Sequence, residues 1–534
     1  MALLAEGRAA AGLAAAAACL GAGDRAVLWG FEGPSARAGL EAALRARGVE
    51  AELRAAFGRR PAATREVVAA PRFLAELWPL PAGVRSALRG GPPGWRVDGR
   101  EVFAPLRPVA APGRREAEGC CGWMRVAGGR DGPVETGLER AVFALLDAAE
   151  RAGGAGRGPW FGVLRLRVEA DFEDARLAEA VHEELYFGAL EALRVRAGAA
   201  PGDRTLTPGK VVPEVVHRAG AAEVAWRAET GPAETATSEP AAPCAPARLA
   251  APPSEGEVLG ALAALGGRPL EVRSGEGRAV RGAVLAGAGP GAVIGGGQHG
   301  NEPTGVVGAL LAARALRDEG ALGVAPLENP DGWALYARLR RDWPGHMHHA
   351  ARYTASGADL AHAPGSEGTL RRRLAEAVGA RLFVSLHGYP AGPWLRPFTG
   401  GLPAGFEDWA LPRGVFLILR VAPGWEAPGR AVLTAAARAL SAEPAVADLN
   451  RAQRAAFRRS APGAPEETRI GEVGVVETGP QPGAPWPVEL VTETPDETVT
   501  GARFRSLARA QAVAATVAVR AWRAFGGGWR FGGA

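Results

Sequence analysis

Short apolar runs alternate with longer amphipathic segments through the second half of the chain. The apolar runs predict β-strands at the start of Ala292–Gly305 and at Leu270–Arg273, Val280–Leu285, Leu322–Leu327, Arg381–Leu386 and Val488–Glu493. Helical spacing of apolar residues predicts helices at Val258–Leu265, Val306–Leu316 and Ala502–Phe525. This alternation of strands and helices predicts an α/β fold in which helices flank a mixed, largely parallel sheet.

A weaker α/β pattern occupies the first half, which we expect to form a smaller α/β domain of unknown role. Its predicted strands are Ala26–Trp29, Trp95–Val97, Arg100–Phe103 and Pro159–Phe172, and its predicted helices include Ala9–Leu20 and Ser35–Arg47. The dipeptide Asp98-Gly99 suits a tight hairpin turn. This half carries no complete set of catalytic residues.

Between the two halves the composition changes to Pro, Ala, Ser and Thr without apolar periodicity. This composition is typical of an extended linker. A chain of 534 residues is also too long for one hydrophobic core. We therefore predict an N-terminal domain at residues 1–229, a linker at 230–257 and a second domain at 258–526.

Charge and cysteine content exclude several classes of protein. The net charge of +5 is small for the length, and no basic patch is interleaved with aromatic residues, which argues against nucleic-acid binding. The four cysteines form no C-x-x-C pair, so a disulfide framework is not expected. The weakly apolar Ala9–Leu20 lacks a basic start, and no segment reaches transmembrane length. We expect a cytoplasmic protein without a membrane partner, and the pattern fixes no oligomeric state.

Candidate metal ligands lie at the ends of two predicted strands. His299 and Glu302 stand in H-x-x-E spacing in the glycine-rich turn of AVIGGGQHGNEPTG, and His387 follows the strand Arg381–Leu386. Six of the eight histidines fall between His299 and His387, which random placement would rarely give. Two His and one Glu form an established ligand set for catalytic zinc, with an open fourth position. The alternative is that His299 caps a turn and His387 is a hydrogen-bonded histidine at a strand end.

Three motifs carry a family resemblance: GGGQHGNEPTG, LENPDG (Leu327–Gly332) and VSLHGY (Val384–Tyr389). In this order and spacing they resemble the zinc metallocarboxypeptidase family. They are also similar to its relatives, the succinylglutamate desuccinylase and aspartoacylase group, whose signature also reads H-G-N-E. The resemblance covers about half of the chain, from roughly Glu257 to Phe525. It implies a zinc carboxypeptidase-like fold in the second domain, bound Zn²⁺ and hydrolysis of an amide bond.

The resemblance also implies an arginine that polarises the scissile carbonyl. Arg338, Arg340 and Arg341 are the candidates, and Arg341 is preferred for its distance from the Pro-Asp-Gly turn. The family's Asp-Leu-Asn-Arg stretch, whose last two residues grip a terminal carboxylate, reads Asp359-Leu360-Ala361-His362 here. Arg352 is an alternative for that grip. The family's mobile tyrosine is also missing, because no Tyr follows Tyr389.

Other acidic residues and histidines near the motifs have open roles. Asp331 and Asp359 compete as the carboxylate that would orient a ligand histidine through its distal ring nitrogen. Asp331 is alternatively part of a plain Pro-Asp-Gly turn. The HMHH run at residues 346–349 lacks a nearby carboxylate in regular spacing, and we interpret it as a loop beside the cleft instead of a second metal site.

The general base would come from one of two carboxylates at strand ends. Glu477 lies near the end of VGVVETGP, and Glu493 lies near the end of VELVTETP, just before the last helix. The position before the terminal helix resembles the family's base strand, so Glu493 is preferred.

The sequence therefore predicts a zinc-dependent, carboxypeptidase-like peptidase that acts on a peptide. A deacylase for N-acyl amino acids is the alternative within the enzymes, and a catalytically silent binding module is the alternative outside them.

Overall fold

The structure of the chain is a computed structural model. It describes residues 2–7, 22, 25–30, 45–48, 50–55, 95–97, 100–102, 123–125, 131–133, 141, 144–146, 148–149, 151, 163–170, 178, 181–182, 185–186, 189, 210–219, 221, 224–231, 241–342, 348–361, 365–389, 414–460 and 467–526. The chain divides into two compact units. The first unit is Met1–Gly231 with Asp342–Met347 and Trp394–Leu411, and the second is Pro232–Arg341, His348–Pro393 and Pro412–Ala534.

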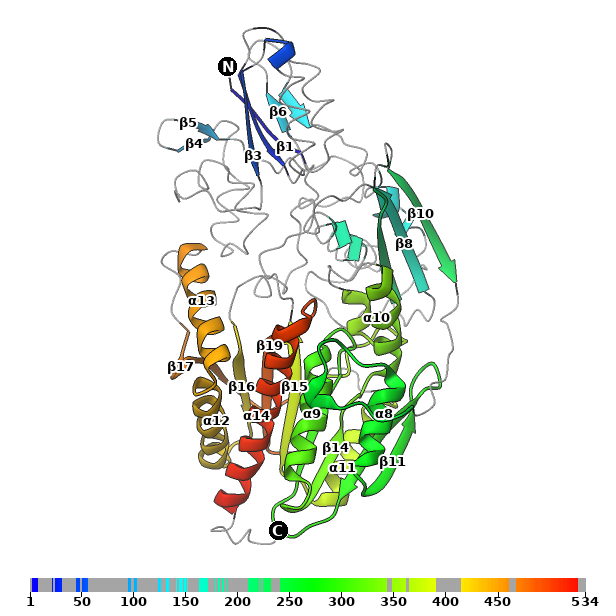
Figure 1. Ribbon diagram of the computed structural model, residues 1–534, viewed down its shortest axis with the longest axis vertical. Coiled ribbons are helices and arrows are strands. Elements are labelled where there is room, and N and C mark those ends of the chain that lie inside the picture. Colours follow the sequence, from blue (N-terminus) through cyan, green and yellow to red (C-terminus); the bar gives the residue numbers. More distant parts are fainter. Residues whose placement is uncertain are drawn as a thin grey trace. The chain divides into compact units, whose positions relative to one another are not determined.

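Among its described residues, the first unit contains two three-stranded sheets and two antiparallel pairs of strands (Figure 1). Its strands are β1 (Ala2–Gly7), β2 (Arg25–Gly30), β3 (Glu50–Ala55), β4 (Trp95–Val97), β5 (Arg100–Val102), β6 (Trp123–Arg125), β7 (Asp131–Pro133), β8 (Val163–Ala170), β9 (Lys210–His217) and β10 (Ala225–Gly231). Strands β4 and β5 pair antiparallel, as predicted for the segments that flank Asp98-Gly99, and these two residues themselves lie outside the described residues. The predicted helix Ala9–Leu20 and most of Ser35–Arg47 lie outside the described residues.

The second unit is built on a nine-stranded sheet of order β11-β12-β14-β13-β15-β19-β16-β18-β17. Its strands are β11 (Arg268–Arg273), β12 (Ala279–Leu285), β13 (Ala292–Gly296), β14 (Leu322–Ala325), β15 (Leu382–Tyr389), β16 (Phe416–Val421), β17 (Arg469–Ile470), β18 (Val473–Thr478) and β19 (Val488–Pro495). The four central strands β14, β13, β15 and β19 are parallel to one another. Strands β12 and β16 run antiparallel to this group, β11 is antiparallel to β12, β18 is parallel to β16, and β17 is antiparallel to β18. The predicted mixed α/β sheet is thus confirmed.

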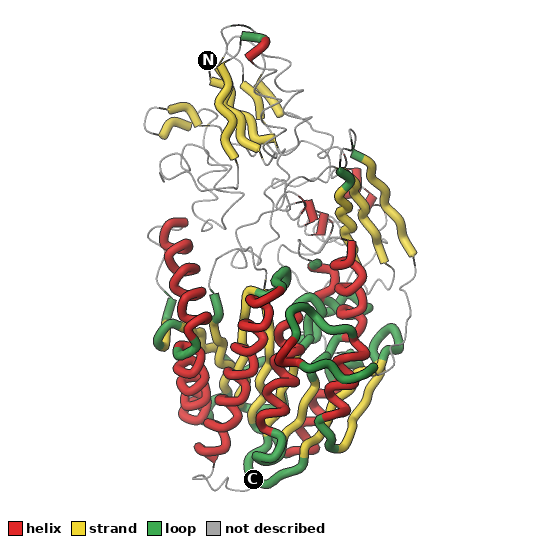
Figure 2. The backbone as a smooth tube through the Cα atoms, in the orientation of Figure 1, coloured by secondary structure: helices red, strands yellow, loops and turns green. Residues whose placement is uncertain are grey.

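Helices cover this sheet (Figure 2). They are α8 (Glu255–Ala264), α9 (Pro303–Leu316), α10 (Pro330–Asp342), α11 (Thr369–Val378), α12 (Glu426–Ser441), α13 (Pro444–Ser460) and α14 (Gly501–Gly526), with short 3-10 turns η1 (Pro246–Arg248) and η2 (His349–Arg352). Helix α14 packs against both α9 and α12, and these three helices pack on strands of the sheet, while α11 packs on β11, β12, β13 and β14. Of the predicted helices, Val306–Leu316 and Ala502–Phe525 are confirmed within a few residues.

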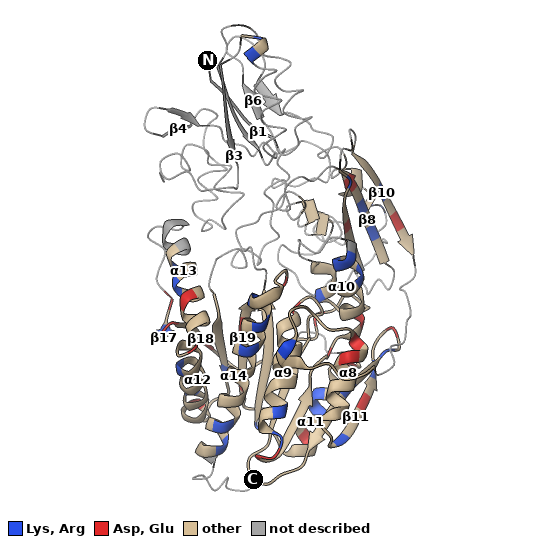
Figure 3. Ribbon diagram, viewed as in Figure 1, with Lys and Arg blue, Asp and Glu red and all other residues tan. Residues whose placement is uncertain are grey.

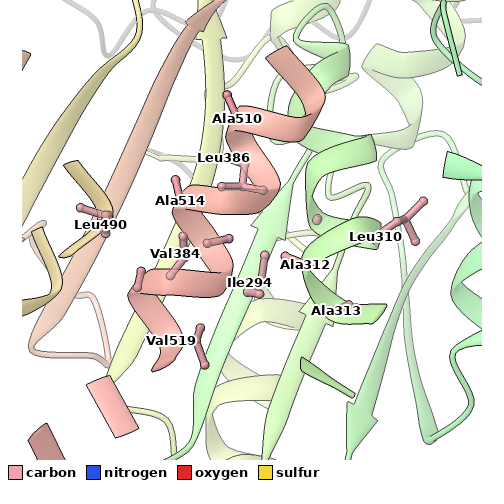
Figure 4. Close-up of a cluster of buried hydrophobic side chains, with 14 of the residues drawn as sticks. Ile294, Leu310, Ala312, Ala313, Val384, Leu386, Leu490, Ala510, Ala514 and Val519 are labelled. Carbon is pink, nitrogen blue, oxygen red and sulfur yellow. The ribbon is translucent and has the colours of Figure 1, made fainter. Parts of the chain in front are cut away.

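The described residues of the second unit form two apolar cores, one beneath α9, α12 and α14 and one beneath α11. The larger core joins α9, α12 and α14 to the sheet through small and branched side chains such as Ile294, Leu386 and Ala514 (Figure 4). The smaller core lies under α11 and includes Phe383 and Trp486. All five residues of β13 are buried, as expected for a central strand that is covered on both faces.

Part of the segment interpreted as a linker belongs structurally to the second unit. Cys244 and Leu249 pack against the larger core. Backbone hydrogen bonds run from Ala241 N to Gly256 O and from Gly501 N to Ala250 O. Helix α8 then begins with a capping box, in which the Ser254 side chain accepts from Glu257 N and the Glu257 side chain accepts from Ser254 N.

Charged residues of both signs are interspersed over the helices and strands of the second unit in the view of Figure 3. This distribution fits the small net charge of +5. Among the described residues, no helix combines the length and apolar character needed to cross a membrane.

Candidate metal centre

Two connections at the carboxyl end of the parallel strands bring the predicted ligands together. His299 lies in the turn between β13 and α9, where Gly297 has a φ of +60° that favours glycine. Glu302 is the residue before the first turn of α9, and His387 lies near the end of β15, which pairs in parallel with β13. Ligands of open α/β sheets bind at this edge.

The three side chains converge at short distances. His299 Nδ1 lies 2.6 Å from Glu302 Oε1, and His387 Nδ1 lies 3.0 Å from Glu302 Oε2. The two Nδ1 atoms are 3.2 Å apart. Gly388 N also donates to Glu302 Oε2 at 3.0 Å. Each side chain is less than one-tenth exposed, so the three polar groups face one another away from bulk water.

Burial and neighbouring charges set the protonation of these groups. Burial lowers the pKa of His387 to about 4 despite the opposing effect of Glu302, so this imidazole is neutral near pH 7. Burial acts to raise the pKa of Glu302, but the two histidines outweigh it and hold that pKa below its ordinary value. Glu302 is therefore ionised. The Glu302 carboxylate and the neutral His387 ring both have lone pairs available for a cation.

This donor set fits a metal ion. Two ligands bound 2.0 Å from a tetrahedral zinc would be about 3.3 Å apart, close to the 3.2 Å between the two Nδ1 atoms. Among the described residues, His299, Glu302 and His387 are the single group of three or more potential ligands whose donor atoms lie within 4.8 Å of one another. His348 and His349 join no such group, and His346 lies outside the described residues.

Glu493 lies on the strand next to the candidate ligands. Strands β15 and β19 are parallel, and their register pairs His387 with Glu493. Burial raises the pKa of Glu493 well above its ordinary value, and the negative charge of Glu302 acts in the same direction. Glu477 has different surroundings, because its side chain is 40% exposed on β18 and is bound by Arg430 at 3.0 Å. The geometry therefore favours Glu493 as the carboxylate next to the candidate metal ligands.

Arg352 and Asp359 close the other side of the site. Arg352 donates to Glu302 Oε1 and to Asp359 Oδ2, both at 3.3 Å. Asp359 lies 3.4 Å from His299 Nε2, the ring nitrogen that faces away from Glu302. Arg341, the residue preferred from sequence, is exposed at the end of α10 and makes none of these contacts. From the sequence, Arg352 was a candidate only for binding a terminal carboxylate. Its position seven residues before Asp359 could have suggested the pairing of the two side chains.

Asp331 binds residues other than the candidate histidines, so Asp359 is the better candidate of the two carboxylates. It accepts from Ser274 Oγ at 2.7 Å and Glu276 N at 2.9 Å, and it pairs with Arg278 at 3.2 Å. The expected Pro-Asp-Gly turn is instead the start of α10, because Asn329 Oδ1 accepts from Gly332 N at 2.9 Å and proline suits a first helical position.

We therefore expect Asp359→Asn to weaken zinc binding by about 10–100-fold, since an amide cannot fix the tautomer of His299 as a carboxylate does. Asp331→Asn is the matched control and should leave zinc affinity unchanged. Competition with a chromophoric chelator measures both dissociation constants. Equal affinities for the two variants would contradict the assignment of Asp359.

A buried ion pair supports the turn that carries His299. Arg371 donates to both oxygens of Glu328, at 2.9 and 3.0 Å, and to Gln298 Oε1 at 3.0 Å. The Gln298 amide nitrogen is then directed to Asp359 Oδ1 at 3.3 Å. Sequence reasoning missed this arrangement, because Glu328, Arg371 and Gln298 meet only after the chain has folded.

No protein-family model matches the chain, and no curated protein matches it. It is similar to a solved metallo-carboxypeptidase from Burkholderia cenocepacia, at 20% identity and a TM-score of 0.33, over 50% of this chain and 70% of that one. Bovine thrombin-activatable fibrinolysis inhibitor matches at 9% identity and a TM-score of 0.30, over 49% and 94% of the two chains. A succinylglutamate desuccinylase from Silicibacter matches at 16% identity and a TM-score of 0.28, over 48% and 65%. The names of the first and third of these structures are those of the two groups that the sequence motifs resemble.

Proposed function

We propose that the second unit is a zinc-dependent hydrolase of amide bonds, with a peptide as its substrate. The observation that carries this proposal is the register of β15 and β19, which pairs Glu493 with His387. His387 in turn belongs to the buried group that it forms with His299 and Glu302. Zinc would be held by His299, Glu302 and His387. When bound, it would supply Lewis-acid chemistry that polarises a carbonyl and lowers the pKa of a water molecule.

The remaining steps fall to side chains of this chain. Glu493 takes a proton from the attacking water and returns it to the leaving amine, for which its buried position and raised pKa are suitable. Arg352 stabilises negative charge on the carbonyl oxygen, because its guanidinium is fixed beside the ligands by Glu302 and Asp359. Asp359 keeps His299 in the orientation required for metal binding.

The role of Arg352 can be separated from that of Arg341. We expect Arg352→Met to lower kcat by about 10²–10³-fold with zinc retained, since one fixed donor to the developing charge is lost. Arg341→Met, which removes an exposed arginine of the same unit, should leave kcat unchanged. Steady-state kinetics on zinc-loaded proteins test this prediction. A larger loss of kcat in the Arg341 variant would indicate that Arg341, and not Arg352, stabilises the carbonyl oxygen.

A deacylase for N-acyl amino acids is the second candidate. The observation in its favour is Ala361, which has no side-chain group to bind a terminal carboxylate and whose carbonyl oxygen accepts from Gln481. A panel of peptides and N-acyl amino acids, tested with zinc-loaded protein and after chelation, distinguishes the two. Metal-dependent cleavage of peptides supports the first candidate, and cleavage of N-acyl amino acids alone supports the second. Zinc binding without turnover of any substrate would support the alternative that the second unit is a catalytically silent binding module.

A further inference from the structure

A group of polar side chains lies within the apolar layer between the sheet and helices α9 and α14. We call it the threonine–glutamine cluster, and its members are Thr304, Thr492, Thr494, Asp496 and Gln511, each no more than 1% exposed. Apolar residues of the same layer include Leu386, Ala510 and Ala514 (Figure 4). Because side chains alternate along β19, Thr492 and Thr494 lie on the opposite face of the sheet from Glu493.

Gln511 is the centre of this cluster. Its Nε2 donates to the backbone oxygen of His387 at 2.7 Å and to Thr494 Oγ1 at 3.1 Å, and its Oε1 accepts from Thr492 Oγ1. A carbonyl oxygen can only accept, so the contact with His387 fixes which end of the amide faces the strand. A Cβ atom at Gly308 would lie only 2.4 Å from Gln511 Cβ, so α9 passes close to this side chain.

A directed series of hydrogen bonds continues from Gln511 to the start of α9. Thr304 donates its hydroxyl to Asp496 Oδ2 at 2.5 Å, and its backbone N donates to the same oxygen at 2.8 Å. Since a hydroxyl has one proton, Thr494 must be the donor in the 3.1 Å contact between the two threonines. The cluster thus connects His387 to Thr492 and Thr494, which flank Glu493, and to Thr304, which lies two residues after Glu302.

Stability alone does not require these polar groups. When both partners of a buried hydrogen bond are replaced by apolar groups of the same shape, the effect on stability can be close to neutral. What an apolar layer would lack is a directional contact to the His387 backbone. We propose that Gln511 is a positioning residue, which sets His387 relative to Glu302 and Glu493 from the far face of the sheet. This inference rests on the proposed function of the metal centre.

The test compares Gln511→Met with Gln453→Met, a buried glutamine in α13 of the same unit. Zinc affinity is measured by chelator competition, and the visible spectrum of the Co²⁺-loaded full-length protein reports the ligand geometry without any turnover. We expect Gln511→Met to bind zinc about tenfold more weakly and to show shifted Co²⁺ bands. Gln453→Met should match the wild type in both measurements.

Thr494→Val serves as a second variant if Gln511→Met does not fold, because valine fills the same space and removes one hydroxyl. It removes the hydrogen bond that Thr494 accepts from Gln511 and the one that it donates to Thr304, and it should shift the Co²⁺ bands in the same direction. Metal binding with a wild-type spectrum and affinity in the folded variants would overturn the positioning role alone. A wild-type protein that binds no metal would overturn the proposed function, and this inference with it.

Discussion

Glu493→Gln is expected to lower kcat by about 10²–10⁴-fold while zinc remains bound. The amide keeps the size of the side chain on β19 but cannot accept a proton from water at neutral pH. Glu493 is not one of the three candidate ligands, so the metal content should stay at the wild-type value. The measurement is steady-state kinetics on the best substrate of the panel, together with zinc content by mass spectrometry.

Glu477→Gln is the matched control, because it makes the same exchange on β18 of the same sheet. Its side chain is exposed and paired with Arg430, so its loss should leave kcat unchanged. If Glu477→Gln lost activity and Glu493→Gln kept it, the assignment of the base would be reversed. If both variants kept full activity, the proposed mechanism would be wrong.

The double variant His299→Ala, His387→Ala should lose zinc entirely and with it all hydrolysis. Two of three protein ligands disappear, and Glu302 alone gives a single carboxylate, which is too few donors for a zinc site. We expect about one zinc ion per wild-type chain and none in the double variant, measured by mass spectrometry after dialysis against a weak chelator.

His217→Ala, in strand β9 of the first unit, is the control for a general effect of histidine loss. It should retain zinc and activity. Retention of zinc by the double variant would place the metal elsewhere in the chain. Absence of zinc from the wild type, even after reconstitution, would remove the basis for a metal hydrolase.

Several strands and helices of the second unit could be predicted from sequence because their apolar patterns are long and regular, whereas α11, α12, α13 and β16 were not among the predicted elements. The predicted helix Ala502–Phe525 corresponds to α14 (Gly501–Gly526), and the predicted strand Val280–Leu285 corresponds to β12 (Ala279–Leu285). The start of α10 was predicted as a turn. Asn-Pro-Asp-Gly favours turns locally, but Asn329 caps a helix here and the following residues continue it.

The candidate ligands could also be proposed from sequence, since each follows an apolar run and strand ends gather at one edge of a sheet. Partners that come from distant loops could not be chosen in this way. Arg341 and Arg352 have the same chemistry, and the choice depends on which of them the fold brings to Glu302. Likewise, Asp331 and Asp359 both lie in stretches that resemble the family, and of the two only Asp359 lies next to His299.

The position of β19 has a consequence for the synthesis of this protein on the ribosome. β19 (Val488–Pro495) follows the other eight strands of this sheet in the sequence, yet it lies between β15 and β16 in the middle of the sheet. Until it emerges, those two strands have no partner at the edges that will face it, and exposed edges promote aggregation. Glu493 lies on the strand that joins β15 to β16, so completion of the sheet and the position of the proposed base depend on the same segment.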